Sequence, residues 1–392
     1  MLKFNPLVAD LPAPPIPQIG AWARAYDGAQ GPLLDMSQAA PGFAPPAALL
    51  TALGQAAASP KAAGYGPIAG ELALRSVYAA EICAIYGADI GAQNIQITAG
   101  CNQAFVACAL ALLAPGETML MTNPYYFNHQ STLAMLGLQV DLVPSDAAYG
   151  FLPDLEALEQ AIRPGVRALA LVSPNNPTGA IYPPDLLLAI FHLCRRKRIW
   201  LILDETYRDF LPEGHGAPHL LLRQPGWQNH LIGLYSFSKS CCIPGHRLGA
   251  ITAGVHALAQ IEKVMDNLQI CAPRAAQIAL AAVLPDLKPW QEENRREIAR
   301  RSVAMRQALD ALEDWEIVSI GAYFAYVRHP YPDIASSFVA EKLGRIGGVL
   351  TVAGDVFGAV QEAYLRFAFA NAPVSAIETL EDRLSRFSLP GI

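Results

Sequence analysis

The sequence predicts an α/β protein with a mostly parallel sheet of the seven-stranded type in a large domain, together with a smaller α/β domain. Between residues 94 and 253, short β-rich runs alternate with segments of helix length, which is typical of parallel strands joined by helices. The runs 168–172 and 199–203 are apolar throughout, as expected of strands covered on both faces. Apolar residues make up 53% of the 392 residues and charged residues only 16%, which favours a large buried core.

The elements before residue 285 follow from these patterns. The first 45 residues are rich in proline, glycine and alanine, and we expect an extended arm there rather than a domain. Helices are predicted at 45–58 and 69–86, where apolar residues recur at helical spacing. Strands are then predicted at 94–98, 118–122, 139–143, 168–173, 199–203, 231–235 and 248–253.

The pattern changes after about residue 285. The later elements predicted are a charged helix at 290–312, a strand at 323–327, a helix at 333–345, a strand at 364–369 and a helix at 374–387. We therefore expect a large domain over 46–285, a small domain over 286–392, and an N-terminal arm over 1–45 that joins the small domain.

Composition excludes several classes of protein. A net charge of −6 disfavours a nucleic-acid binder, and the basic run at 195–198 is better explained as the solvated end of a helix. The longest apolar run, 104–114, is too short to cross a membrane, and the first residues lack the pattern of a signal peptide. The 7 cysteines include no CxxC pair, so neither a disulfide framework nor a metal site is indicated. We expect a soluble, cytoplasmic protein with reduced cysteines.

The candidate functional residues follow the carboxyl ends of predicted strands, where open α/β sheets bind ligands. After the strand at 94–98, Gly100 allows a close approach of the backbone, and the amides of Cys101 and Asn102 begin a helix that suits a phosphate. A tight turn without a ligand explains this segment equally well. Asn176 lies in Ser-Pro-Asn-Asn-Pro-Thr-Gly, where flanking prolines would hold its side chain rigidly, although a plain proline-rich turn is the simpler explanation.

Two further strand ends carry charges. Asp204 directly follows five apolar residues, and a carboxylate there needs a partner, either as a helix cap or as the counter-charge of a cofactor cation. Lys239 ends the segment Ser236-Phe237-Ser238-Lys239, and Arg247 lies eight residues further on. A lone lysine is usually a solvated surface group, but at this edge a depressed pKa would make it a nucleophilic amine.

The order of these motifs resembles the signature of fold type I pyridoxal-5′-phosphate (PLP) enzymes of the aminotransferase class I/II family. The motifs are NNPTG around Asn176, D-x-x-Y from Asp204 to Tyr207, S-x-S-K at Lys239, and R-L-G at Arg247. The resemblance extends from Pro41 to the strand of Arg366. It implies an aspartate aminotransferase-like fold, PLP as the cofactor, and transfer of an amino group between an L-amino acid and a 2-oxo acid.

The resemblance also implies residue roles. It implies that Lys239 holds PLP covalently and moves protons, that Asp204 pairs with the ring nitrogen, and that Asn176 and Tyr207 bind the ring's phenolic oxygen. Tyr126 would stack on the ring, with Tyr125 as a rival. The phosphate would be bound by Gly100, Cys101, Asn102, Ser236, Ser238 and Arg247. No metal site is implied.

The substrate and the assembly follow in the same way. Arg366 matches the arginine that binds the substrate α-carboxylate, with Asn176 and Ala39 nearby. The chain departs from the family pattern at three positions. Ala39 stands where the family usually has glycine, Ala353 where it usually has proline, and His246 where it often has an apolar residue. These departures concern the substrate pocket. Tyr65 matches a tyrosine that reaches the cofactor phosphate of the other subunit, so the resemblance implies a homodimer.

Two alternatives remain open at this stage. The same scaffold could carry a PLP-dependent lyase, of the C–S β-lyase or decarboxylase type, because the motifs fix the cofactor and not the bond that breaks. A more remote alternative is an aminotransferase-like regulatory sensor, which would need an additional basic DNA-binding domain.

Overall fold

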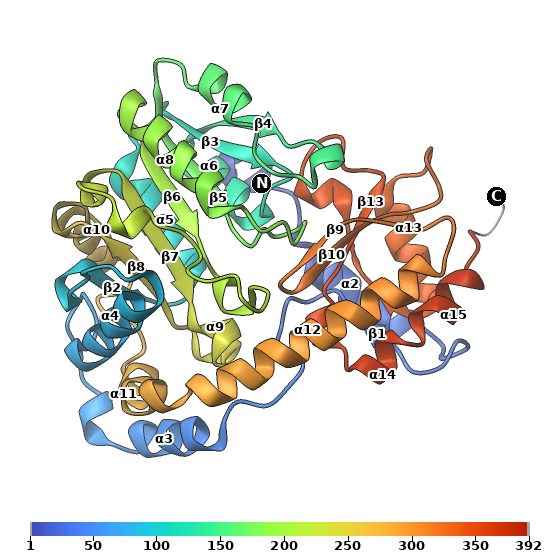
Figure 1. The fold of residues 1–392 in the computed structure, drawn as a ribbon, viewed down its shortest axis with the longest axis horizontal. Coiled ribbons are helices and arrows are strands. Elements are labelled where there is room, and N and C mark those ends of the chain that lie inside the picture. The colour runs from blue at the N-terminus through green and yellow to red at the C-terminus, as the bar shows by residue number, and fades with distance from the viewer. Residues whose placement is uncertain (1, 390–392) are drawn as a thin grey trace.

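The computed structural model describes residues 2–389, and a seven-stranded sheet forms its centre (Figure 1). Only β8 runs against its neighbours, so the predicted, mostly parallel sheet is confirmed. The strands in spatial order are β2 (Ile95–Thr98), β8 (Gly249–Ala253), β7 (Leu231–Ser236), β6 (Trp200–Asp204), β5 (Val166–Val172), β3 (Thr118–Asn123) and β4 (Gln139–Pro144).

Helices cover both faces of this sheet, which explains its apolar strands. Successive residues of β6 point to opposite faces, so that Leu201 and Leu203 join one buried cluster and Ile202 joins the other. The first cluster is completed by α3 (Ala47–Ala57), α4 (Leu72–Tyr86), α7 (Leu155–Ala161), α8 (Pro184–Lys197) and α11 (Arg274–Val283). The second is completed by α5 (Cys101–Leu112), α6 (Phe127–Met135) and α10 (Val255–Leu268).

The C-terminal part forms a second sheet with its own buried cluster. Its antiparallel strands are, in spatial order, β12 (Val352–Ala353), β13 (Tyr364–Phe367), β10 (Phe324–Arg328) and β9 (Glu316–Gly321). Around them lie α12 (Lys288–Asp310), α13 (Ser336–Lys342), α14 (Val374–Ile377) and α15 (Leu380–Ser385). One helix was predicted over 374–387; instead it is split, because the Thr379 hydroxyl donates back to the Ala376 carbonyl where α14 ends.

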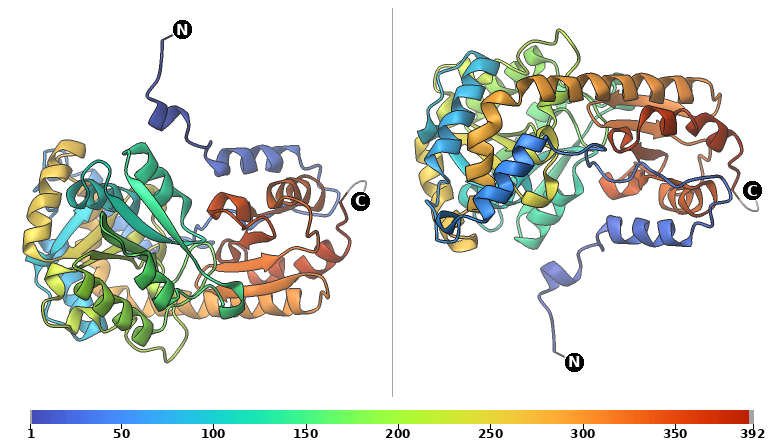
Figure 2. Two further views of the ribbon diagram at one scale, coloured as in Figure 1. Left: turned by 90° about the horizontal axis from the view of Figure 1, so that it is seen from above. Right: turned by 90° about the horizontal axis from the view of Figure 1, so that it is seen from below.

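The prediction of an extended N-terminal arm is wrong for much of its length. The structure has α1 (Pro6–Ala9) and α2 (Pro15–Ala25), and β1 (Leu34–Asp35) pairs with β11 (Val349–Leu350). Both helices begin with proline, which suits the first turn because no backbone N–H is needed there. α2 lies beside the C-terminal part (Figure 2) and buries Ile19 and Trp22 in its core.

Other predictions from composition can also be checked. The basic run does form the last turn of α8 and its left-handed cap at Arg198. All seven cysteines are free. Among residues 2–389, none of the helices is both long enough and apolar enough to cross a bilayer.

Candidate active site

A cavity of about 450 Å³ lies where the strands of the large sheet meet the N-terminal segment and β13. Loops that follow β3, β5, β6 and β7 contribute to it, as does the start of α5. Of the sequence-predicted residues, the cavity is lined by Ala39, Cys101, Asn102, Tyr126, Asn176, Asp204, Tyr207, Ser236, Ser238, Lys239, Arg247 and Arg366. These residues come from distant parts of the chain, so the fold brings together what the sequence separates.

The start of α5 forms a corner of this cavity whose groups are suited to an anion. Gly100 has φ +84°, a left-handed conformation that favours glycine, and leaves the first amides of α5 free of helical partners. An added Cβ at Gly100 would lie 2.2 Å from Nη2 of Arg247, so the glycine makes room for the guanidinium. Arg247 donates to the Pro244 carbonyl at 2.9 Å and lies 3.5 Å from the Ser238 hydroxyl. The corner therefore offers a cation, a hydroxyl and a helix N-terminus to one ligand.

Asp204 ends β6 as a fully buried carboxylate. Its Oδ1 accepts hydrogen bonds from the Thr206 amide at 2.9 Å and from the Thr206 hydroxyl at 2.7 Å. Its Oδ2 accepts from the Cys101 thiol at 3.2 Å and lies 3.5 Å from Nε2 of His129. Burial alone would raise the pKa of Asp204, but His129 and the Thr206 donors outweigh it and hold the pKa below its usual range. The carboxylate is thus kept ionised beside the cavity.

Lys239 is held as an amine that loses its proton easily. It lies in α9 (Phe237–Ser240), the short helix after β7, and its Nζ donates to the Ala39 carbonyl. Burial, together with the positive charges of Arg366 and Arg247, lowers the pKa of Lys239 from 10.5 to about 8. The depressed pKa expected from the sequence is therefore present, and a large fraction of the amine is neutral near pH 8.

Arg366 is a buried guanidinium, only 3% exposed, on β13. Nη1 donates to the Asn176 side chain at 2.8 Å, and Nη2 donates to the Ser37 carbonyl. Its Nε has no hydrogen-bond partner, and no acidic side chain in residues 2–389 forms an ion pair with it. Arg366 is therefore not a member of a surface salt bridge among residues 2–389. A buried cation with a free donor needs an anion, and a carboxylate fits the planar fork.

The aromatic residues divide between the cavity and the core. Tyr126 lines the cavity at the N-terminus of α6, where its hydroxyl accepts from the Asn128 amide at 2.8 Å. Tyr125 instead packs against the cluster on one face of the large sheet. Tyr207 also lines the cavity, and its ring contacts Phe324 edge-on with the centroids 5.0 Å apart. Stacking of Tyr126 on a cofactor ring stays a prediction.

Tyr65 does not lie in this cavity. It is 80% exposed and does not belong to the residues that line the cavity of its own chain. Gly100 and Tyr125, the rival of Tyr126, are also outside the lining. The backbone of Gly100 shapes the corner without facing the space.

Sequence reasoning missed the residues that hold the charged groups in place. Thr206 and His129 contact Asp204, and Ser37 holds Arg366 together with Asn176, which the sequence had already singled out. Thr206 stands two residues after Asp204, a spacing typical of an Asx turn, and could have been found in this way. His129 lies on another element and stacks on Phe105 with the centroids 3.8 Å apart, so only the tertiary fold reveals it.

Comparison with known proteins gives one consistent family. The family model for aminotransferase class I and II matches residues 31–384. The arginine–pyruvate transaminase of Pseudomonas aeruginosa is 30% identical over 381 residues, covering 94% of this chain and 92% of that protein. An aromatic aminotransferase of Arabidopsis thaliana is 28% identical over 70% of each chain. The Thermus thermophilus aspartate aminotransferase double mutant has a TM-score of 0.89 and 25% identity, covering 98% of this chain and 100% of that one.

The lowered pKa of Lys239 gives a first prediction. Only a neutral amine acylates, so the rate of Lys239 acetylation in the apoprotein should rise with pH through about 8, well below the 10.5 of an ordinary lysine. Arg366→Gln removes one neighbouring positive charge and should move this midpoint upwards. Competitive labelling followed by peptide mapping measures the midpoint of this pH dependence in wild type and in the variant. A midpoint near the ordinary value in wild type would contradict the electrostatic argument.

Proposed function

Because the chain belongs to the aminotransferase class I and II family, we propose that the cavity around Lys239 performs the amino-group transfer of that family. The protein is a PLP-dependent aminotransferase, which moves an amino group between an L-amino acid and a 2-oxo acid. One observation supports this use of the cavity above all others. An amine of lowered pKa, an ionised carboxylate and an unpaired buried guanidinium, from Lys239, Asp204 and Arg366, line a single space.

The residues present fit PLP on chemical grounds. Arg247 and the start of α5 offer donors to a phosphate, and Asp204 offers a negative charge to a protonated ring nitrogen. Asn176 and Tyr207 would bind the phenolic oxygen, and Lys239 would hold the cofactor covalently. When bound, the cofactor supplies a ring that withdraws electrons from the substrate's α-carbon.

Arg366 orients the substrate in this proposal. Its fork binds the α-carboxylate in two places, and Asn176 and Ser37 keep the fork from rotating. A carboxylate also satisfies the free Nε, so binding removes the cost of a buried unpaired donor. Arg366, Asn176 and Lys239 line the same space. A substrate held by its carboxylate at Arg366 therefore presents its α-hydrogen within reach of Lys239.

Lys239 moves the proton. The amine of the substrate would first take the place of Lys239 on the cofactor, which frees Nζ as a neutral amine. The freed Nζ would then take the α-proton of the amino acid, become an ammonium group, and later return a proton to complete the transfer. A pKa of about 8 suits both halves of this exchange, since the group gains and loses its proton near neutral pH. The Ala39 carbonyl accepts a hydrogen bond from this amine and limits where it can point.

We further propose that two copies of the chain form a homodimer with shared sites. Tyr65 is an exposed aromatic residue outside its own cavity, and such a residue is well placed to serve a neighbouring copy. A two-fold interface would bring each Tyr65 to the phosphate corner of the other chain.

Two coarser features complete the proposal. Separate buried clusters in the large and small sheets support a boundary near residue 285, between domains 46–285 and 286–392, with residues 1–45 joined to the latter. The seven free cysteines are compatible with the reducing cytoplasm, where we propose that the enzyme acts.

The catalytic role of Lys239 can be tested directly. Reduction with borohydride should make the linkage of the cofactor to Lys239 irreversible and should label no other lysine. Lys239→Ala should bind PLP without covalent attachment and should lose about 10²–10⁴ in the rate of the half-reaction, the usual contribution of a general acid–base group. Peptide mapping and the absorbance change with arginine, phenylalanine and aspartate measure these effects. A single turnover with amino acid alone identifies a transaminase, whereas continuous turnover would identify a lyase.

Arg366→Lys keeps the positive charge but loses the planar fork. Substrate binding should weaken by about 10- to 100-fold, the range expected when a hydrogen bond to a charged group is lost, while PLP remains bound. Titration of the holoenzyme with a non-reacting carboxylic acid such as maleate measures this affinity. If the variant binds the acid as wild type does, the α-carboxylate is held by another residue.

A mixed dimer tests the shared site. Lys239→Ala and Tyr65→Phe chains, combined, should give one site free of both defects and one site carrying both. PLP retention at the site with Lys239 should therefore equal that of wild type. If it equals that of the Tyr65→Phe homodimer, Tyr65 serves its own chain and the proposal is wrong.

A further inference from the structure

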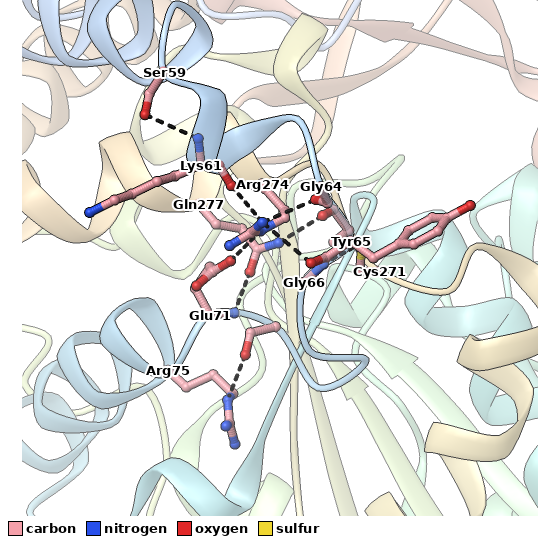
Figure 3. Close-up of polar contacts among 12 residues, drawn as sticks. Ser59, Lys61, Gly64, Tyr65, Gly66, Glu71, Arg75, Cys271, Arg274 and Gln277 are labelled. Carbon is pink, nitrogen blue, oxygen red and sulfur yellow. Dashed lines mark hydrogen bonds and ion pairs between the residues drawn. The ribbon is translucent and has the colours of Figure 1, made fainter.

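The turn that carries Tyr65 is organised by Arg274, the first residue of α11 (Figure 3). Nη1 of Arg274 donates to the carbonyls of Lys61 at 2.6 Å, Gly64 at 3.0 Å and Tyr65 at 3.3 Å. Its Nε donates to Oε1 of Glu71 at 2.6 Å. One side chain thus ties together the beginning and end of a turn that lies more than 200 residues away in the sequence.

The surroundings of Arg274 are built to keep it there. The guanidinium packs against Gly66, where an added Cβ would lie 2.8 Å from Nε, so that a larger residue at this position would displace the arginine. The Gly66 amide donates to the Cys271 thiol at 3.4 Å, which attaches the turn to the residues before α11. The side-chain oxygen of Gln277, on α11, accepts from the backbone N–H of Glu71 at 2.7 Å and so holds the main chain of the residue that forms the ion pair.

The side chain of Tyr65 takes no part in this network. In Figure 3 its ring points away from Arg274 and from the other residues drawn. The ring is 80% exposed, and within residues 2–389 its hydroxyl makes no hydrogen bond. Ordering a turn costs conformational entropy, and an exposed ring contributes little to the core in return. The network therefore orders the backbone of a residue whose side chain is directed outside its own chain.

We propose that Arg274 is a positioning residue, which presets the Tyr65 turn so that the tyrosine hydroxyl meets the cofactor phosphate of the partner subunit. This inference rests on the proposed shared site. A turn that is already ordered before assembly loses less entropy when it makes its contact, so the affinity for PLP is higher. The fork is essential because a single side chain must reach several carbonyls and a carboxylate together.

The test compares four variants of the full-length protein, namely Tyr65→Phe, Arg274→Met, Arg274→Lys and the double variant Arg274→Met/Tyr65→Phe. Arg75→Met is the matched control, because Arg75 also donates to two carbonyls, those of Gly70 and Ala92, but to none in the turn. The dissociation constant of PLP is measured by reconstitution of each apoprotein, and amide hydrogen exchange reports on residues 61–66. Sedimentation gives the oligomeric state, and thermal unfolding gives the stability.

Arg274→Met should weaken PLP binding by about tenfold, near the lower limit for a hydrogen bond to a charged group, and speed exchange in 61–66. The double variant should bind PLP no more weakly than Tyr65→Phe alone, because both changes remove the same contact. Arg274→Lys keeps the ion pair to Glu71 and should recover thermal stability but not PLP affinity. Arg75→Met should bind PLP as wild type does.

Two results would overturn the inference for different reasons. If Tyr65→Phe leaves PLP affinity unchanged, the shared site is wrong, and the positioning role of Arg274 fails with it. If Tyr65→Phe weakens PLP binding but Arg274→Met does not, or if the two losses add, the shared site stands and Arg274 serves only the stability of its own chain.

Discussion

The arrangement of the molecule depends on a buried positive charge without an acidic partner. Taking a guanidinium out of water is costly, and Arg366 recovers only part of that cost from Asn176 and the Ser37 carbonyl. Burial lowers its pKa to about 10, which still leaves it charged at neutral pH. Its partners lie in the loop after β5 and in the N-terminal segment, while Arg366 lies on β13. The large sheet, the N-terminal segment and the small sheet therefore all meet at one guanidinium.

The sequence predicted the strands well, and most of the residues that it singled out line one cavity, because both depend on local signals. Continuous apolar runs mark the buried strands, and the motifs around Asn176, Asp204 and Lys239 stand directly at their ends. The N-terminal arm was mispredicted because proline was taken as a sign of extended chain, although at Pro15 it starts a helix. His129 and Arg274 could not be found, since their partners Asp204 and Tyr65 are distant in the sequence. Contacts of this kind leave no periodic pattern.

Close approach of arginine to backbone recurs at two glycines. At Gly100 the guanidinium of Arg247 occupies the space that a side chain would need, and at Gly66 the guanidinium of Arg274 does the same. In both places a cation is fixed by contact with main chain and carbonyl groups, which are themselves held by neighbouring elements. Rigid placement matters because a cation that serves as an anion ligand contributes most when it need not reorganise on binding.

The charges that line the cavity would couple the binding of an anion to the protonation of Lys239. Among the residues described, three cations, Lys239, Arg247 and Arg366, face one carboxylate, Asp204. The excess of positive charge is complementary to a phosphate and a substrate carboxylate. It also lowers the pKa of Lys239, since Arg366 and Arg247 both oppose a third positive charge nearby. When anions neutralise these arginines, that opposition falls and Lys239 holds a proton more readily. In the proposed mechanism, a substrate carboxylate at Arg366 would therefore also prepare Lys239 to accept the α-proton.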